Sequence, residues 1–175
     1  MSMVKRSAMI LAALLGVAVA NAPGASAAAD GTVRFTNQQN VACIRGAAFG
    51  LNTDCFGPAA EMNWTLRQIP TAPVEYRYIQ SNFGRGCWTD DDSVFYLSAC
   101  NYGGLPGRQI WSIVRYQPGP PPSGMAGVRL ENVVTNKCMD TDATGSTLVR
   151  NNCSNSSRTQ QWNIPLAAFN AMFTP

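Results

Sequence analysis

Hydrophobic positions between residues 31 and 165 fall in short alternating runs. The segments Val33-Arg-Phe35 and Tyr76-Arg-Tyr78 place apolar side chains at every second position, which is typical of a strand with one buried face. Clusters of Gly, Asn, Pro and Asp interrupt the runs before any of them reaches helical length. The pattern therefore predicts a chain of short strands and turns, with helix improbable.

The strand pattern recurs three times along the chain. Each unit begins at an apolar-Arg-apolar triplet, passes two cysteines and ends on a tryptophan. The interval from triplet to first cysteine is 10, 11 and 10 positions, and from that cysteine to the tryptophan 21, 24 and 24. Such recurrence indicates an internal repeat, with unit one at about 31–70, unit two at 74–116 and unit three at 126–165. Three units of short strands predict an all-β fold closed by pseudo-threefold symmetry.

Two segments lie outside this repeat. The proline-rich run 117–124 fits a stiff surface connection between units two and three. The tail 166–175 has little charge and is too short for a stable helix on its own. We expect the tail either to pack across the base of the fold or to dock a partner.

The N-terminal segment has the features of a secretory signal. Lys5 and Arg6 precede an apolar run, and Ala25-Ser-Ala27 supplies the small residues that signal peptidase accepts. We therefore expect residues 1–27 to be a signal peptide and 28–175 to form one secreted, extracellular domain. The apolar run is too short for a permanent membrane span, and no second run of that kind follows.

All six cysteines lie in the part of the chain expected to be exported, where disulfides persist. Six cysteines allow 15 pairings in principle. The spacings of 12, 13 and 15 residues favour one disulfide within each unit: Cys43–Cys55, Cys87–Cys100 and Cys138–Cys153. A metal site is not expected, because close CxxC spacing is lacking and the sequence contains no histidine.

Charge and composition argue against several functional classes. Without the signal peptide's Lys5 and Arg6, the chain keeps 11 basic against 10 acidic residues, so a basic footprint for nucleic acid is lacking. The absence of histidine removes the usual general base and the Ser-His and Cys-His pairs. We expect no catalysis and no cofactor. The acidic run Asp90-Asp-Asp92 is interpreted as a solvated turn rather than a calcium site.

Several motifs resemble the Q-x-W repeat of ricin B-type lectins. Gln109-Ile-Trp111 and Gln160-Gln-Trp162 match the signature itself, and Cys138-Met-Asp140 is similar to the Cys-Leu-Asp opening of that repeat. The resemblance spans about residues 31–165 and implies a β-trefoil fold. Unit one departs from it, since Met62 stands where the glutamine belongs.

The signature residues are predicted mainly to stabilise the fold rather than to contact a ligand. One tryptophan in each unit offers a large apolar body to a shared core, and the adjacent glutamine can satisfy buried backbone groups. We expect Trp64, Trp111 and Trp162 to be buried, and also Trp88, which follows Cys87 directly.

The resemblance also implies where a sugar would bind. A family pocket has an acid after the first cysteine, an aromatic residue before the second, and a polar side chain beside the signature glutamine. Unit three keeps the acid as Asp140 and the glutamine as Gln160. Asn151 stands at the aromatic position and Thr159 at the polar one. These four residues form the favoured carbohydrate site.

The other two units depart further from this pattern. Unit two has Thr89 at the acid position and Ser98 at the aromatic position, but Tyr96 lies two residues earlier on the same strand face. Tyr96 is therefore a candidate for the aromatic residue of a rearranged pocket in unit two. Unit one has Arg45 in place of the acid, and it is expected to be structural only.

Two functional classes fit these observations. One is a secreted, non-catalytic lectin that binds a glycan or polysaccharide. The other is a protein-interaction module on the same scaffold, such as a toxin's cell-binding subunit or an inhibitor, whose sugar pockets have decayed. Fold alone does not choose between them. The recurring Q-x-W signature favours the lectin.

Overall fold

The computed structural model describes residues 31–46, 50–52, 55–84, 86–104 and 107–174. The predicted signal peptide, 1–27, lies outside the described residues. None of the described helices is long and apolar enough to cross a membrane.

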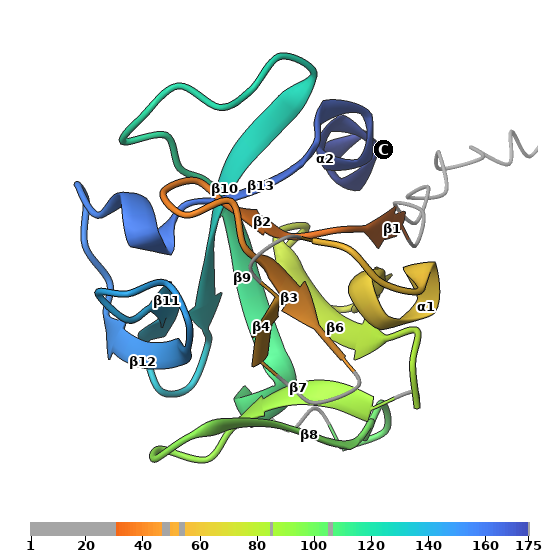
Figure 1. The fold of residues 1–175 in the computed structure, drawn as a ribbon. Helices are drawn as coiled ribbons and strands as arrows, with labels where there is room; N and C mark the ends of the chain where they lie inside the picture. The colour runs from red at the N-terminus through yellow and green to blue at the C-terminus, as the bar shows by residue number, and fades with distance from the viewer. Residues whose placement is uncertain (1–30, 47–49, 53–54, 85, 105–106, 175) are drawn as a thin grey trace, which may run out of the picture.

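Each third of the chain repeats the same order of short elements (Figure 1). Unit one contains β1 (Gly31–Val33), β2 (Thr36–Asn37), β3 (Cys43–Arg45), β4 (Gly50–Asn52), α1 (Ala59–Met62) and β5 (Trp64–Gln68). Unit two contains β6 (Tyr76–Ser81), β7 (Gly86–Asp90), β8 (Phe95–Ala99), the 3-10 turn η1 (Gly107–Gln109) and β9 (Ile110–Arg115). Unit three contains β10 (Met125–Asn132), β11 (Lys137–Thr141), β12 (Leu148–Asn152), the 3-10 turn η2 (Arg158–Gln160), β13 (Trp162–Pro165) and the terminal helix α2 (Leu166–Phe173).

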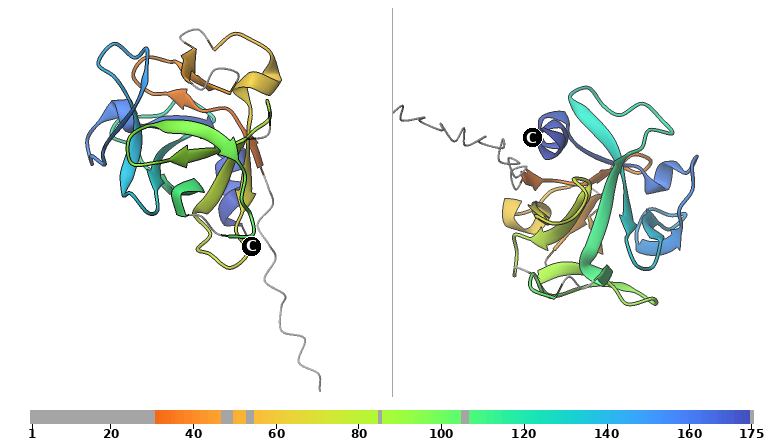
Figure 2. Two further views of the ribbon diagram at one scale, coloured as in Figure 1. Left: turned by 90° about the horizontal axis from the view of Figure 1, so that it is seen from below. Right: turned by 180° about the vertical axis from the view of Figure 1, so that it is seen from behind.

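Antiparallel pairing joins the units into a closed barrel. The outer strands of each unit pair with each other, and β5–β6, β9–β10 and β13–β2 join one unit to the next. Because β1 and β2 are successive segments of one extended stretch, the path closes on itself. Each unit also carries a hairpin, β3–β4, β7–β8 or β11–β12, beside the barrel (Figures 1 and 2). This is the predicted β-trefoil fold.

The tryptophans occupy the shared core as the sequence predicted. Trp64, Trp88, Trp111 and Trp162 are fully buried. The ring of Trp88 lies 4.7 Å from that of Trp64 and 5.8 Å from that of Trp111, with both pairs edge to face, a favoured geometry for aromatic rings. The fourth tryptophan therefore packs between the signature residues of units one and two.

Each signature tryptophan also makes the same hydrogen bond. The indole N–H of Trp64 donates to the Ile44 carbonyl at 3.2 Å. The equivalent bonds run from Trp111 to Trp88 and from Trp162 to Met139, both at 3.1 Å. In all three cases the acceptor follows the first cysteine of the unit. The bond ties the end of each unit to its hairpin and satisfies a donor that burial would otherwise strand.

The disulfides pair within units, as the cysteine spacing predicted. The three bridges are Cys43–Cys55, Cys87–Cys100 and Cys138–Cys153, each with 5.0 Å between the Cα atoms. Each bridge closes one hairpin of its unit. Unit boundaries and covalent crosslinks therefore coincide.

The expectation of strands and turns alone is wrong for unit one, which contains the short helix α1. The tail, expected to be too short for a stable helix on its own, forms a helix packed against the barrel. Helix α2 packs on β1, β10 and β13, with Phe169 and Met172 buried in the core cluster. The buried Arg77 donates to the Met172 carbonyl at 2.9 Å, where a helix leaves carbonyl groups without helical partners. Tertiary contacts thus stabilise a helix that would be marginal in isolation.

Candidate functional site

The acid predicted for unit three lies at the centre of a small polar cluster. Asp140, on β11, is 4% exposed. One carboxylate oxygen accepts from the side-chain amides of Asn151 and Gln160, each at 3.0 Å. The other oxygen accepts from the backbone N–H of Thr141 at 2.7 Å. The fold therefore brings Asp140, Asn151 and Gln160 together from separate elements.

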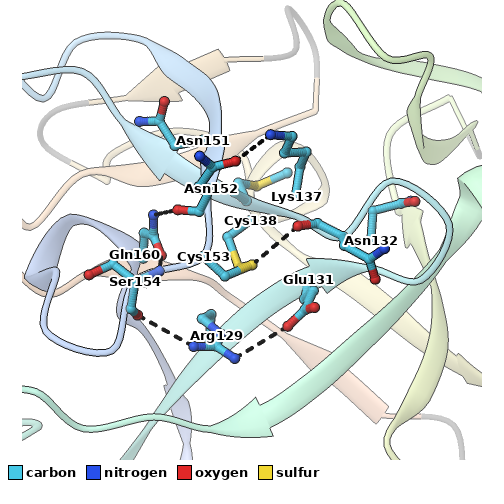
Figure 3. Close-up of a disulfide and its surroundings, with 12 residues drawn as sticks. Arg129, Glu131, Asn132, Lys137, Cys138, Asn151, Asn152, Cys153, Ser154 and Gln160 are labelled. Atoms are coloured by element: carbon cyan, nitrogen blue, oxygen red, sulfur yellow. Dashed lines mark hydrogen bonds and ion pairs between the residues drawn. A yellow bond between two sulfur atoms is a disulfide. The ribbon is translucent and has the colours of Figure 1, made fainter.

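Gln160 holds this cluster in place from the turn η2. Its amide nitrogen also donates to the Asn152 carbonyl at 2.8 Å, and its oxygen accepts from the Ser154 backbone N–H at 2.8 Å. Figure 3 shows the Gln160 side chain reaching Asn152, beside the Cys138–Cys153 disulfide. The glutamine thus binds the backbone on both sides of Cys153, the structural role predicted for it.

Thr159 makes its hydrogen bonds with residues other than Asp140. Its hydroxyl bonds that of Ser157 at 2.6 Å, and its carbonyl accepts from the side chain of Asn37, in unit one, at 2.6 Å. The exposed Asn151, by contrast, covers Asp140 directly. Of the two neutral groups predicted beside the acid, the structure brings only Asn151 into contact with it.

The electrostatics of the cluster are unusual for a buried acid. Within the described ranges, no lysine or arginine forms a salt bridge with Asp140. Its hydrogen-bond donors are neutral amides. A carboxylate has about four acceptor sites, and the three bonds made here leave room for a further hydrogen bond from a hydroxyl group.

Unit two repeats the arrangement without the acid. Gln109 donates to the hydroxyls of Thr89, at 3.2 Å, and Ser98, at 2.7 Å, and these hydroxyls bond each other at 2.6 Å. Tyr96 lies opposite Thr89 in the pairing of β7 with β8 and is 39% exposed. The structure thus places an aromatic ring beside the unit-two cluster, but the cluster itself is made of neutral hydroxyls.

In unit one an ion pair replaces the polar cluster. The Arg45 guanidinium lies 2.6 Å from the Glu61 carboxylate, and Met62, at the glutamine position, is fully buried. Charge at the acid position is therefore reversed and already neutralised.

The interpretation of the acidic run as a solvated turn is wrong for its first residue. Asp90 is fully buried and accepts from Arg150, on β12 of unit three, at 2.7 Å. It also accepts from the Thr135 hydroxyl. The exposed Asp92 pairs with both Arg108 and Arg150. No local sequence signal marks this network, because its partners are far apart along the chain.

Asp91 does behave as a turn residue. Its carboxylate accepts from the backbone N–H groups of Val94 and Ser93, both at 2.9 Å, and from the Ser93 hydroxyl at 2.7 Å. The bond from Val94 contributes most, and together these bonds lower the pKa of Asp91 to about 2. They stabilise the ionised form of an exposed group.

Within the part of the chain that the structure describes, one group of side chains lies close enough to be considered as metal ligands. It comprises Glu131, Cys138 and Cys153. Both sulfur atoms belong to a disulfide, so neither is the thiolate that binds a metal. Glu131 itself pairs with Arg129 at 3.2 Å (Figure 3). The arrangement is that of a crosslinked strand and not a metal centre.

Comparison with known proteins agrees with the fold. No protein-family model and no curated protein sequence matches the chain. Among solved structures it is similar to SeviL bound to asialo-GM1 saccharide, with 18% identity, a TM-score of 0.58, and coverage of 78% of this chain and 97% of that one. It is similar to the BEL beta-trefoil, at 12% identity, TM-score 0.61, and 78% and 94% coverage. The cytolethal distending toxin of Haemophilus ducreyi matches at 17% identity, TM-score 0.54, and 77% and 82% coverage. At such identities the likeness concerns the β-trefoil fold.

Proposed function

We propose that this protein is a secreted, non-catalytic carbohydrate-binding module of the ricin B type, with its sugar site in unit three. One observation carries the proposal: the Asp140 carboxylate, on the hairpin strand β11, is held by neutral donors, and one of these donors belongs to the exposed residue Asn151. Two neighbouring sugar hydroxyls are suitable donors to such a carboxylate.

Binding requires the Asn151 side chain to move. Asn151 is exposed, so its amide can leave the Asp140 oxygen for water while a sugar hydroxyl takes its place. Gln160 remains bonded to Asp140 and to the Asn152 carbonyl, and it keeps the acid in position. Because no aromatic ring stacks on the sugar here, millimolar affinity is expected, about −4 kcal/mol.

The structural neighbours support a binding module. SeviL is described in complex with a saccharide, and its likeness in fold makes a saccharide a reasonable ligand for this chain. The three intra-unit disulfides favour an extracellular location. The lack of histidine favours binding without catalysis.

The test is a glycan-array screen of the oxidised chain, followed by titration of the best ligand. Asp140→Asn should abolish binding competed by free sugar, while its circular dichroism and melting curve stay close to wild type. Asn151→Tyr should bind about 2- to 12-fold more tightly, because it removes the cover and supplies a ring worth roughly 0.5–1.5 kcal/mol.

The matched control combines both changes. Asp140→Asn with Asn151→Tyr should lose the gain if the tyrosine acts beside the acid, whereas a gain retained in the double variant would contradict the unit-three site. Tyr96→Ala should have no effect. If Tyr96→Ala removes binding and Asp140→Asn does not, the rearranged unit-two pocket is the site.

A protein-interaction module is the second candidate, and the state of the other two units favours it. Arg45 is neutralised by Glu61, and Thr89 carries no charge. A blank glycan screen with a folded protein would select this alternative.

A further inference from the structure

The junction between units one and two differs from that between units two and three. Asp90 is the third residue after the first cysteine of unit two, and Arg150 is the third residue before the second cysteine of unit three. The two form an ion pair across the junction between units two and three. Counting from the cysteines, their equivalents at the first junction are Gly46 and Leu97. A glycine and an aliphatic side chain cannot form the ion pair that fills the second junction.

A hollow occupies this first junction. Its volume is about 650 Å³, and Gly46 and Leu97 both line it, together with Gln80, Phe83 and Tyr102. This is within the size range of small-molecule sites. The hollow lies where the other junction holds its ion pair.

Two further hollows each share one lining residue with the first. One of about 440 Å³ shares Tyr102 with it, and one of about 320 Å³ shares Gln80. Arg67 lines both of these smaller hollows. We name the three together the junction groove. Three neighbouring hollows suit an extended chain of several units better than a single compact ligand.

Two partly exposed aromatic residues line the junction groove. Tyr102 is 46% exposed and Phe83 is 44% exposed. The Tyr102 ring packs edge to face on Tyr78 at 5.1 Å, and the Arg67 guanidinium carbon lies 5.8 Å from the Tyr102 ring centre. These contacts fix the orientation of Tyr102. An aromatic ring held in this way offers an apolar face at little entropic cost.

The charge of the junction groove has one sign. Among the described residues that line it, Arg67 is the one with a formal charge, and no acid is present. Its Nε donates to the Gln80 side-chain oxygen at 2.6 Å, which orients the guanidinium. Planar guanidinium groups bind carboxylates and sulfates more specifically than ammonium groups do.

We propose that the junction groove binds an anionic oligosaccharide, with sugar rings against Tyr102 and Phe83 and an acidic substituent at Arg67. The site is separate from the unit-three pocket, since Asp140, Asn151 and Gln160 take no part in lining it. An acid such as Asp140 would repel the ligand that Arg67 attracts. The two sites therefore select different saccharides.

The experiment is calorimetric titration of the full oxidised chain with three probes. They are an oligogalacturonate hexamer, a heparin-derived hexasaccharide and neutral maltohexaose. We expect one or both anionic probes to bind and maltohexaose to bind at least about tenfold more weakly. Affinity should fall as salt rises, because a charged contact is screened.

Variants locate the site. Arg67→Gln should weaken anionic binding about tenfold, and Phe83→Ala and Tyr102→Ala about fivefold each. Tyr96→Ala, at an exposed tyrosine outside the junction groove, should leave anionic binding unchanged. If Tyr102→Ala destabilises the protein, Phe83→Ala still tests whether aromatic side chains of the junction groove contribute to binding.

Three results would overturn the proposal. They are no binding of either anionic probe, equal loss in Tyr96→Ala, or equal binding of maltohexaose with no effect of Arg67→Gln. If Asp140→Asn alone loses binding, the ligand binds in unit three and not in the junction groove. Because Asp140→Asn and Arg67→Gln affect different sites, failure of one proposal is distinguishable from failure of the other.

Discussion

The Arg150 guanidinium lies 2.7 Å from the buried carboxylate of Asp90, and this ion pair joins unit three to unit two. The Asp90 side chain is fully buried, and that of Arg150 is 16% exposed. The backbone N–H of Asp92 and the Thr135 hydroxyl also donate to Asp90. Removing the counter-ion of a buried charge strongly destabilises a fold, because the charge that remains is uncompensated.

Removing the cation should therefore destabilise the fold. We expect Arg150→Gln to lower the free energy of unfolding by about 3 kcal/mol, because Asp90 would remain buried without its counter-charge. Urea denaturation followed by tryptophan fluorescence measures the change. Arg108→Gln, whose partner Asp92 is exposed, serves as control and should cost less than about 1 kcal/mol. Equal losses in the two variants would contradict a buried, structural pair.

The indole hydrogen bond of unit three gives a second prediction. Trp162→Phe keeps an aromatic ring but leaves the Met139 carbonyl without its donor. An unsatisfied buried group costs roughly 1–3 kcal/mol, and we expect at least that loss in the free energy of unfolding. Val94→Ala, at an exposed position, should stay within about 0.5 kcal/mol of wild type. A wild-type melting temperature for Trp162→Phe would show that the bond is dispensable.

The turn carboxylate of Asp91 gives a prediction on pH. Its pKa is lowered from 3.8 to about 2, first by the backbone bond from Val94. A carboxyl group whose pKa is lower in the folded than in the unfolded protein stabilises the fold at every pH above its unfolded-state pKa. For Asp91 this contribution is lost as the pH falls from about 4 towards 2. A side-chain carbon NMR titration should find a midpoint near 2 for Asp91.

Asp91→Asn is the matching variant for that titration. It keeps a side-chain oxygen as acceptor but has no charge to titrate. The decline in melting temperature between pH 4 and 2 should therefore be shallower than in the wild type. A wild-type midpoint close to 3.8 would show that the turn bonds are not made in solution.

Much of the fold could be predicted from the sequence, because short-range patterns of residues specify it and these patterns occur three times. The tryptophan spacing indicated three units, and Trp64, Trp111 and Trp162 do occupy equivalent buried positions. The cysteine intervals favoured the observed pairing, since residues 12 to 15 apart are brought together by a single hairpin. Within the candidate site, the contact of Gln160 with the backbone also followed from its type and position.

Other features depended on how the units are placed against one another. The sequence by itself determined the repeat, the crosslinks and the tryptophan core, because strand periodicity and short-range spacing are properties of neighbouring residues. Only the tertiary structure decided that Asp90 meets Arg150 and that Asn151 covers Asp140. It also placed Gly46 beside a groove and gave the tail a surface on which to form a helix. Such contacts join side chains across hairpins and units, and their energies depend on burial and relative position, which no local pattern encodes.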